Sequence, residues 1–143
     1  MKSLVFLTMI TGLFVSCNLS PKQITYGTDA CHYCNMNIVD SHHASQIVTS
    51  KGKAYKYDAI ECMLNSIGDE FKNTEVSLYL TADFNQPGQL TDATQAWYLI
   101  SDQISSPMGA NLSAFKDEKF AQQAMEKFTG KIFSWEEIQN HLK

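Results

Sequence analysis

Residues 44–63, ASQIVTSKGKAYKYDAIECM, carry the signals of a strand, a turn, a second strand and the start of a helix. Residues 44–49 are rich in apolar and β-branched side chains, which predicts a strand. Residues 51–53, Lys-Gly-Lys, predict a turn, and residues 54–57 predict a second strand. Two strands separated by so short a turn indicate a β-hairpin.

A helix is expected directly after this hairpin. Asp58 is a typical N-cap residue and Glu61 follows three positions later, so the two predict a capping box. Apolar residues then recur at helical spacing, and Gly68 indicates that the helix ends or frays nearby. Residues 76–80 predict a third strand. The expected apolar face of the helix consists of Ile60, Met63, Leu64, Ile67 and Phe71.

The second half of the chain has a similar order. Residues 96–101 predict a strand, residues 117–128 a helix and residues 131–133 a short strand. Residues 103–108 are either the hairpin partner of the first of these strands or a loop, because Pro107 is unfavourable in a central strand. The second half therefore resembles the first in element order, though not in residue identity.

These elements predict an α+β fold of two ββαβ units packed together. The halves span residues 29–81 and 95–143, and a polar linker, residues 82–94, joins them. Ser134 and Glu137 form a second capping box, which predicts a short C-terminal helix.

The N-terminus has the features of a secretory signal. Lys2 precedes an apolar run over residues 4–15, which is shorter than the ~20 residues needed to span a bilayer. Because Cys17 follows this run after a small residue, residues 1–16 are interpreted as a lipoprotein signal peptide and Cys17 as the lipidated residue. Residues 17–28 would then be a tether that leaves the domain outside the cytoplasm.

Composition restricts the functional classes. All eleven basic residues are Lys, and the formal net charge is −4. Nucleic-acid recognition favours Arg and positive surfaces, so no nucleic-acid partner is expected. The sequence also lacks a Gly-rich phosphate loop, a nucleophile elbow and an acid–base carboxylate pair, so no enzymatic activity is expected.

The most informative segment is residues 31–36, CHYCNM. Two thiols, an imidazole and a thioether lie within six positions, and thiolate with thioether selects Cu(I) over harder ions. Met108, between Pro107 and Gly109, belongs to no apolar stripe, but by sequence alone it is a core or incidental residue more often than a ligand. Cys62 lies about 200° around its helix from Ile60, on the side opposite the apolar face. The sequence leaves three environments open for its side chain: a second packing surface, solvent or a metal site.

Two other interpretations of the cysteines stay open. A CxxC motif is also typical of extracytoplasmic thiol–disulfide oxidoreductases, although those place it after a strand at the start of a helix. A structural zinc site would need Cys62 and a His as further ligands, and the sequence has no second CxxC. With Cys17 lipidated, three thiols remain, and an odd number of thiols cannot all be paired in disulfides.

Several separated segments together resemble the NosL family, the copper-chaperone lipoproteins that accompany nitrous-oxide reductase. DACHYCNMNIVD resembles the family's C-x-x-C-G-M segment, with Asn35 in place of Gly; Asn tolerates a left-handed backbone, so the turn is expected to persist. The segments that carry the resemblance are residues 29–40, 57–63, 78–80, 90–100, 107–115 and 133–138.

The resemblance implies a Cu(I)-binding metallochaperone held in the cell envelope by a lipid anchor, with its domain facing the periplasm. It implies delivery of copper to the copper–sulfide centre of nitrous-oxide reductase, with that enzyme and its maturation machinery as partners in denitrification. It also implies that Met108 is a ligand across a cleft from the Cys-Met segment. The expected ligands are Cys34, Met36 and Met108, then Cys31, with His32 as an outer candidate.

Overall fold

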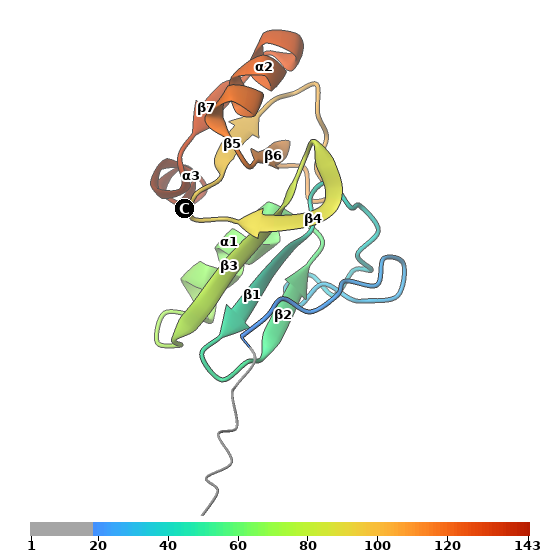
Figure 1. Cartoon of the computed structure of the whole chain (residues 1–143), viewed down its shortest axis with the longest axis vertical. Helices are drawn as coiled ribbons and strands as arrows, with labels where there is room; N and C mark the ends of the chain where they lie inside the picture. The colour runs from blue at the N-terminus through green and yellow to red at the C-terminus, as the bar shows by residue number, and fades with distance from the viewer. Residues whose placement is uncertain (1–18) are drawn as a thin grey trace, which may run out of the picture.

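The computed structural model describes residues 19–143 and contains two antiparallel sheets and three helices in that range. The expected signal peptide, residues 1–16, and the expected lipidation at Cys17 lie outside the described residues. Figure 1 shows the two sheets one above the other, with the C-terminus beside the junction between them. In residues 19–143, no helix combines the length and apolar character that crossing a bilayer requires.

The first half forms a four-stranded sheet with strand order β2-β1-β3-β4. The hairpin predicted from residues 44–57 is present, and the helix α1 connects it to the third strand. The elements are β1 (Ser45–Thr49), β2 (Ala54–Tyr57), α1 (Ile60–Asp69), β3 (Val76–Asp83) and β4 (Gln86–Asp92).

The second half forms a three-stranded sheet with order β6-β5-β7. In both sheets the first strand of the half lies between its hairpin partner and the strand that follows the helix, as expected for two ββαβ units. The elements are β5 (Trp97–Ile100), β6 (Leu112–Phe115), α2 (Glu118–Phe128), β7 (Lys131–Phe133) and α3 (Trp135–His141).

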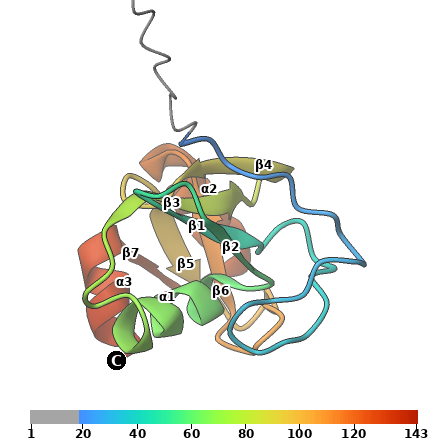
Figure 2. The ribbon, with the colours of Figure 1, turned by 90° about the horizontal axis from the view of Figure 1, so that it is seen from below.

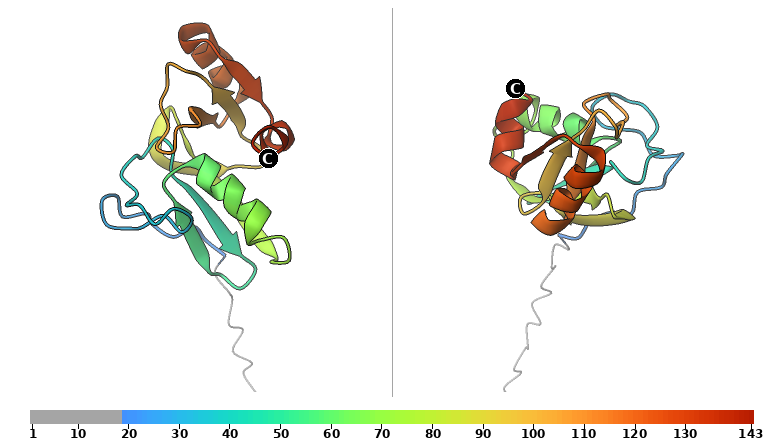
Figure 3. Two further views of the ribbon diagram at one scale, coloured as in Figure 1. Left: turned by 180° about the vertical axis from the view of Figure 1, so that it is seen from behind. Right: turned by 90° about the horizontal axis from the view of Figure 1, so that it is seen from above.

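Helix α1 packs against both halves. Met63 is fully buried in the core beneath the first sheet, while Ile60 is fully buried against the second sheet and α3. Helix α2 covers the opposite face of the second sheet through Ala121 and Ala124 (Figures 1 and 3). The N-terminal end of α1 therefore lies where the two halves meet.

The capping box predicted at Asp58 and Glu61 is wrong. The helix begins one residue later than expected, with Ala59 as its N-cap and no side-chain cap. Both acidic side chains have tertiary partners instead: Asp58 accepts a hydrogen bond from the Cys34 thiol, and Glu61 accepts one from Ser106. The capping box of Ser134 and Glu137 is confirmed at the start of α3.

Residues 82–94, expected as a polar linker, contain the strand β4, which pairs with β3. The side chains of β4 are mostly exposed because it is an edge strand, so its sequence lacks the apolar alternation of a strand that covers a core. Residues 103–108, whose sequence fits either a strand or a loop, form a loop between β5 and β6.

Candidate metal centre

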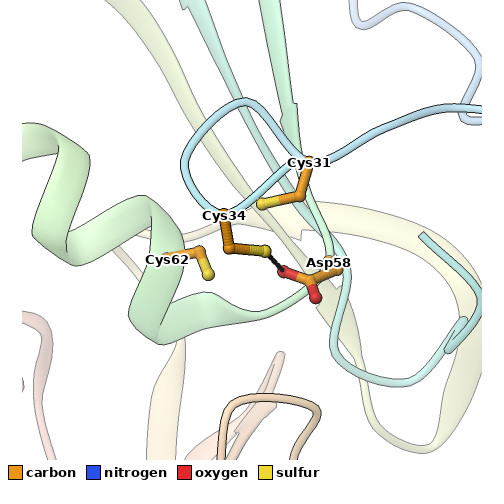
Figure 4. Close-up of side chains that lie close together, drawn as sticks. All are labelled: Cys31, Cys34, Asp58 and Cys62. Atoms are coloured by element: carbon orange, nitrogen blue, oxygen red, sulfur yellow. Dashed lines mark hydrogen bonds between the residues drawn. The ribbon is translucent and has the colours of Figure 1, made fainter. Parts of the chain in front are cut away.

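The CHYCNM segment forms a closed turn in the loop that precedes β1. The Cys31 backbone N–H donates to the Met36 carbonyl at 2.7 Å, and the Asn35 N–H donates to the Cys31 carbonyl at 2.9 Å. Asn35 has φ 61°, so the left-handed conformation expected at this position is confirmed. The turn brings the side chains of Cys31 and Cys34 to one side (Figure 4).

This turn is attached to the edge of the first sheet. The His32 N–H donates to the Lys56 carbonyl of β2 at 2.8 Å. The Lys56 ammonium donates to the Asp29 carboxylate and to the Gln23 carbonyl, each at 2.6 Å. The hydrogen bond from Lys56 is the main reason that the pKa of Asp29 lies below its usual value. Backbone and side-chain bonds thus fix where the thiols lie.

Three thiols and one carboxylate converge beside the N-terminus of α1. One ligand atom from each of Cys31, Cys34, Asp58 and Cys62 lies within 4.8 Å of the other three. Cys31 and Cys62 are each 1% exposed and Asp58 is 2% exposed, whereas Cys34 is only partly buried. All three cysteines are free thiols, and Figure 4 shows their sulfur atoms pointing toward one another.

The chain positions Asp58 and Cys62 through the junction of β2 and α1. Asp58 follows directly after β2, and Cys62 is the third residue of α1. Both side chains point toward the CxxC loop, and the extended backbone of Ala59 between them means that no helical turn relates the two. No partner of Cys62 can be assigned from the sequence, and the sequence predicts Asp58 only as a helix cap. A tertiary contact joins both residues to the loop, so no local spacing signals their pairing with the CxxC motif.

The thiols have unequal pKa values. A hydrogen bond from the Cys62 thiol lowers the pKa of Cys31 to about 6, which favours a thiolate at neutral pH. The same interaction, together with burial, raises the pKa of Cys62 well above its usual value. Burial is the main cause that raises the pKa of Cys34. The metal-free cluster therefore favours one thiolate, at Cys31, stabilised by a neighbouring thiol.

Of the other expected ligands, His32 is not part of this cluster, and both methionines are exposed. The His32 Nε2 atom is 2.8 Å from the Glu70 carboxylate, and its ring contacts the edge of Tyr55. Met36 is 51% exposed and Met108 is 43% exposed, which is unusual for large apolar side chains. Both thioethers are thus accessible to an incoming ion or partner.

The Met108 loop is held against α1 by a buried carboxylate. Glu61 Oε1 accepts hydrogen bonds from the Ser106 hydroxyl at 2.5 Å and from the Ala110 N–H at 3.3 Å. Glu61 is the immediate neighbour of Cys62, so these bonds bring the loop to the end of α1 that carries the thiols. Figures 2 and 3 show this loop, residues 101–111, beside the loop that contains the CxxC motif.

Ser106→Ala is expected to lower the free energy of unfolding by about 1–3 kcal/mol, because it removes a donor from a buried carboxylate. Within the described residues Glu61 Oε2 already lacks a hydrogen-bond partner, so only the 3.3 Å bond from the Ala110 N–H to Oε1 would remain. Denaturant unfolding measures the change. In a Glu61→Ala background the same substitution should cost much less, and equal costs in both backgrounds would show that Ser106 acts independently of Glu61.

Comparison with known proteins identifies related chains. The sequence profile of the NosL family matches residues 21–142. The copper-binding lipoprotein NosL of Stutzerimonas stutzeri is 27% identical over 124 residues. The aligned region covers 82% of this chain but 65% of that relative, slightly less than two thirds of its length.

A solved structure also matches. The crystal structure of the copper chaperone NosL from Shewanella denitrificans superposes with a TM-score of 0.71, covering 83% of this chain and 95% of that one. The identity is 19%, so this match supports the fold alone. Since the family profile covers nearly all of the described chain, this protein belongs to the NosL family.

Proposed function

We propose that this protein is a Cu(I) carrier of the cell envelope that delivers copper to nitrous-oxide reductase. The observation that carries the proposal is the convergence of the Cys31 and Cys34 thiols, both free, in one metal-sized cluster. Sulfur donors select soft ions such as Cu(I). The names of the relatives, a copper-binding lipoprotein and a copper chaperone, support copper as the metal.

The exposure of the sulfur atoms suits transfer rather than permanent storage. Cys34 is partly exposed, and the thioethers of Met36 and Met108 are near the surface on two adjacent loops. An acceptor protein can therefore reach one ligand at a time and take the ion by ligand exchange. In this proposal, Cys31 and Cys34 bind the ion, the thioethers of Met36 and Met108 are further, weaker ligands, and His32 stays an outer candidate.

The setting of the proposed function is the outer face of a membrane. Lipidation of Cys17 would attach the domain there, and the Stutzerimonas relative is named a lipoprotein. The proposed recipient is the copper–sulfide centre of nitrous-oxide reductase, reached with its maturation machinery on the periplasmic side. A carrier of this kind transfers an ion without a chemical conversion, so we propose no enzymatic activity.

A thiol–disulfide oxidoreductase is less compatible with this geometry. Reactive cysteines lie in partly exposed positions, often at a helix N-terminus. Cys31, the first cysteine of the motif, is 1% exposed, and the motif lies in a loop before β1. An active oxidoreductase would oxidise dithiols without metal and would be insensitive to loss of either methionine.

One observation favours a second candidate, a structural zinc site. The Asp58 carboxylate completes a set of three sulfurs and one oxygen within 4.8 Å, and four such ligands fit tetrahedral zinc. In that case the purified protein would contain zinc, and a chelator would unfold it. The Cu(I) carrier should instead stay folded when it is metal-free.

Met36→Ala and Met108→Ala are each expected to weaken Cu(I) binding by about tenfold or more, about 1.4 kcal/mol. The reason is loss of a thioether that holds the ion at the surface. The measurement is competition between a Cu(I) chelator and the full chain, purified reduced in detergent. Met125→Ala is the matched control, because Met125 lies on α2 and packs toward the far face of the second sheet, so its loss should not alter affinity.

Delivery is tested by mixing the Cu(I)-loaded protein with copper-depleted nitrous-oxide reductase. We expect copper to move to the reductase, measured as the copper content of each protein after they are separated. Weak Cu(I) binding by the unmodified chain would contradict the carrier, and tight binding without transfer would contradict the recipient.

A further inference from the structure

We infer that Cys62 is a third thiolate ligand of the copper ion. This inference rests on the proposed Cu(I) site and adds to it one residue of helix α1. It follows from the position and burial of that residue rather than from the CxxC motif.

The spacing of the sulfur atoms suits one ion. Three sulfurs bound at about 2.3 Å, the length found in zinc thiolates, would lie about 4 Å apart in a flat trigonal arrangement. The Sγ atoms of Cys31, Cys34 and Cys62 are already within 4.8 Å of one another. Small side-chain movements therefore suffice to enclose an ion, and the loop need not refold.

Helix α1 holds Cys62 more firmly than the loop holds Cys34. The residues on either side of the helix, Ile60 and Met63, are fully buried against different sheets. Cys62 is itself 1% exposed, so its sulfur has few positions other than the one facing Cys31. A ligand fixed by packing loses little freedom when an ion binds, which favours affinity.

A buried carboxylate orients one of the sulfurs. Asp58 is 2% exposed and makes no ion pair among residues 19–143. Its carboxylate accepts a hydrogen bond from the Cys34 thiol at 3.5 Å, which directs that sulfur into the cluster.

The binding step balances without any redox partner. Each thiol that becomes a thiolate ligand releases one proton to solvent, and copper stays Cu(I) throughout. Because Cys31 and Cys62 are buried and Cys34 is not, Cys34 is the thiolate that an acceptor can replace first. The two buried sulfurs and the ligand from the acceptor then hold the ion until the acceptor replaces the remaining thiolates.

X-ray absorption of the Cu(I)-loaded full chain tests the third thiolate by counting sulfur neighbours. The count is made in a Met36→Ala, Met108→Ala background, so that thioethers do not contribute. We expect three sulfurs per copper in this background, and two when Cys62→Ala is added to it. Two sulfurs with Cys62 intact would overturn the inference, while failure of the unmodified chain to bind Cu(I) would instead overturn the proposed function on which it rests.

Affinity gives a second test. Cys62→Ala should weaken Cu(I) binding about ten- to hundredfold. Met63→Ala truncates the neighbouring buried side chain, so it should lower stability while leaving affinity unchanged. If Met63→Ala and Cys62→Ala weaken binding equally, Cys62 acts through packing alone and is not a ligand.

Discussion

Replacing Cys31 and Cys34 together by serine is expected to lower Cu(I) affinity by about a thousandfold or more, about 4 kcal/mol. The hydroxyl oxygen of serine is a hard donor with little preference for Cu(I), so both sulfurs of the CxxC motif are lost while the side-chain shape is nearly kept. Competition with a Cu(I) chelator measures the change in the full chain.

The single variant Cys34→Ser separates binding from folding. Cys34 is partly exposed, so its replacement should leave the unfolding midpoint nearly unchanged while affinity falls. Cys31 is buried, and its replacement carries some cost in stability that denaturant unfolding reports separately. A double variant that is folded and binds Cu(I) within about threefold of the unmodified chain would show that copper binds elsewhere.

Gly130→Ala is expected to destabilise the fold by about 3 kcal/mol or more, because the new methyl group has no space. A Cβ at this position would lie 2.2 Å from the Ile100 carbonyl oxygen and 3.1 Å from its carbonyl carbon. Both are backbone atoms of β5, which pairs with β7 at Ile100 and Lys131. The backbone at Gly130 also has φ 123°, which strains any other residue. Thermal or denaturant unfolding measures the loss.

Gly88→Ala is the matched control. Gly88 also has positive φ, at 82°, but a methyl group added there would have no described atom within 4 Å beyond its chain neighbours. Only backbone strain should then appear, about 1 kcal/mol. Equal losses in the two variants would mean that strain, rather than the clash with β5, explains why Gly130 is needed.

The local part of the fold could be predicted from the sequence. The β1–β2 hairpin and the capping box of α3 depend on short-range patterns, and both are present. The expected apolar face of α1 is present from Ile60 to Ile67, but Phe71 lies beyond the end of the helix at Asp69. The missed strand β4 is an edge strand with mostly exposed side chains, so the hydrophobic pattern that indicates strands is absent there.

The site was only half accessible to sequence reasoning. Cys31 and Cys34 are three residues apart, and their CxxC spacing alone indicates that one ion can bind both. Asp58 and Cys62 join them only because β2 brings the chain back beside the loop, which is a tertiary contact. The wrong capping box has the same origin. Asp58 and Glu61 fit a local motif, but their carboxylates accept hydrogen bonds from Cys34 and Ser106 instead.

The two edges of the first sheet also affect whether copies of this protein aggregate. An exposed edge strand offers unpaired N–H and C=O groups to another chain and so promotes aggregation. On β4, Pro87 has no N–H to donate, and the pairing with β3 shifts register between Ala82 and Asp83. On β2, the Lys56 carbonyl already accepts a hydrogen bond from the His32 N–H. The loop that carries the thiols therefore also protects the sheet, so crowded neighbours should not join edge to edge.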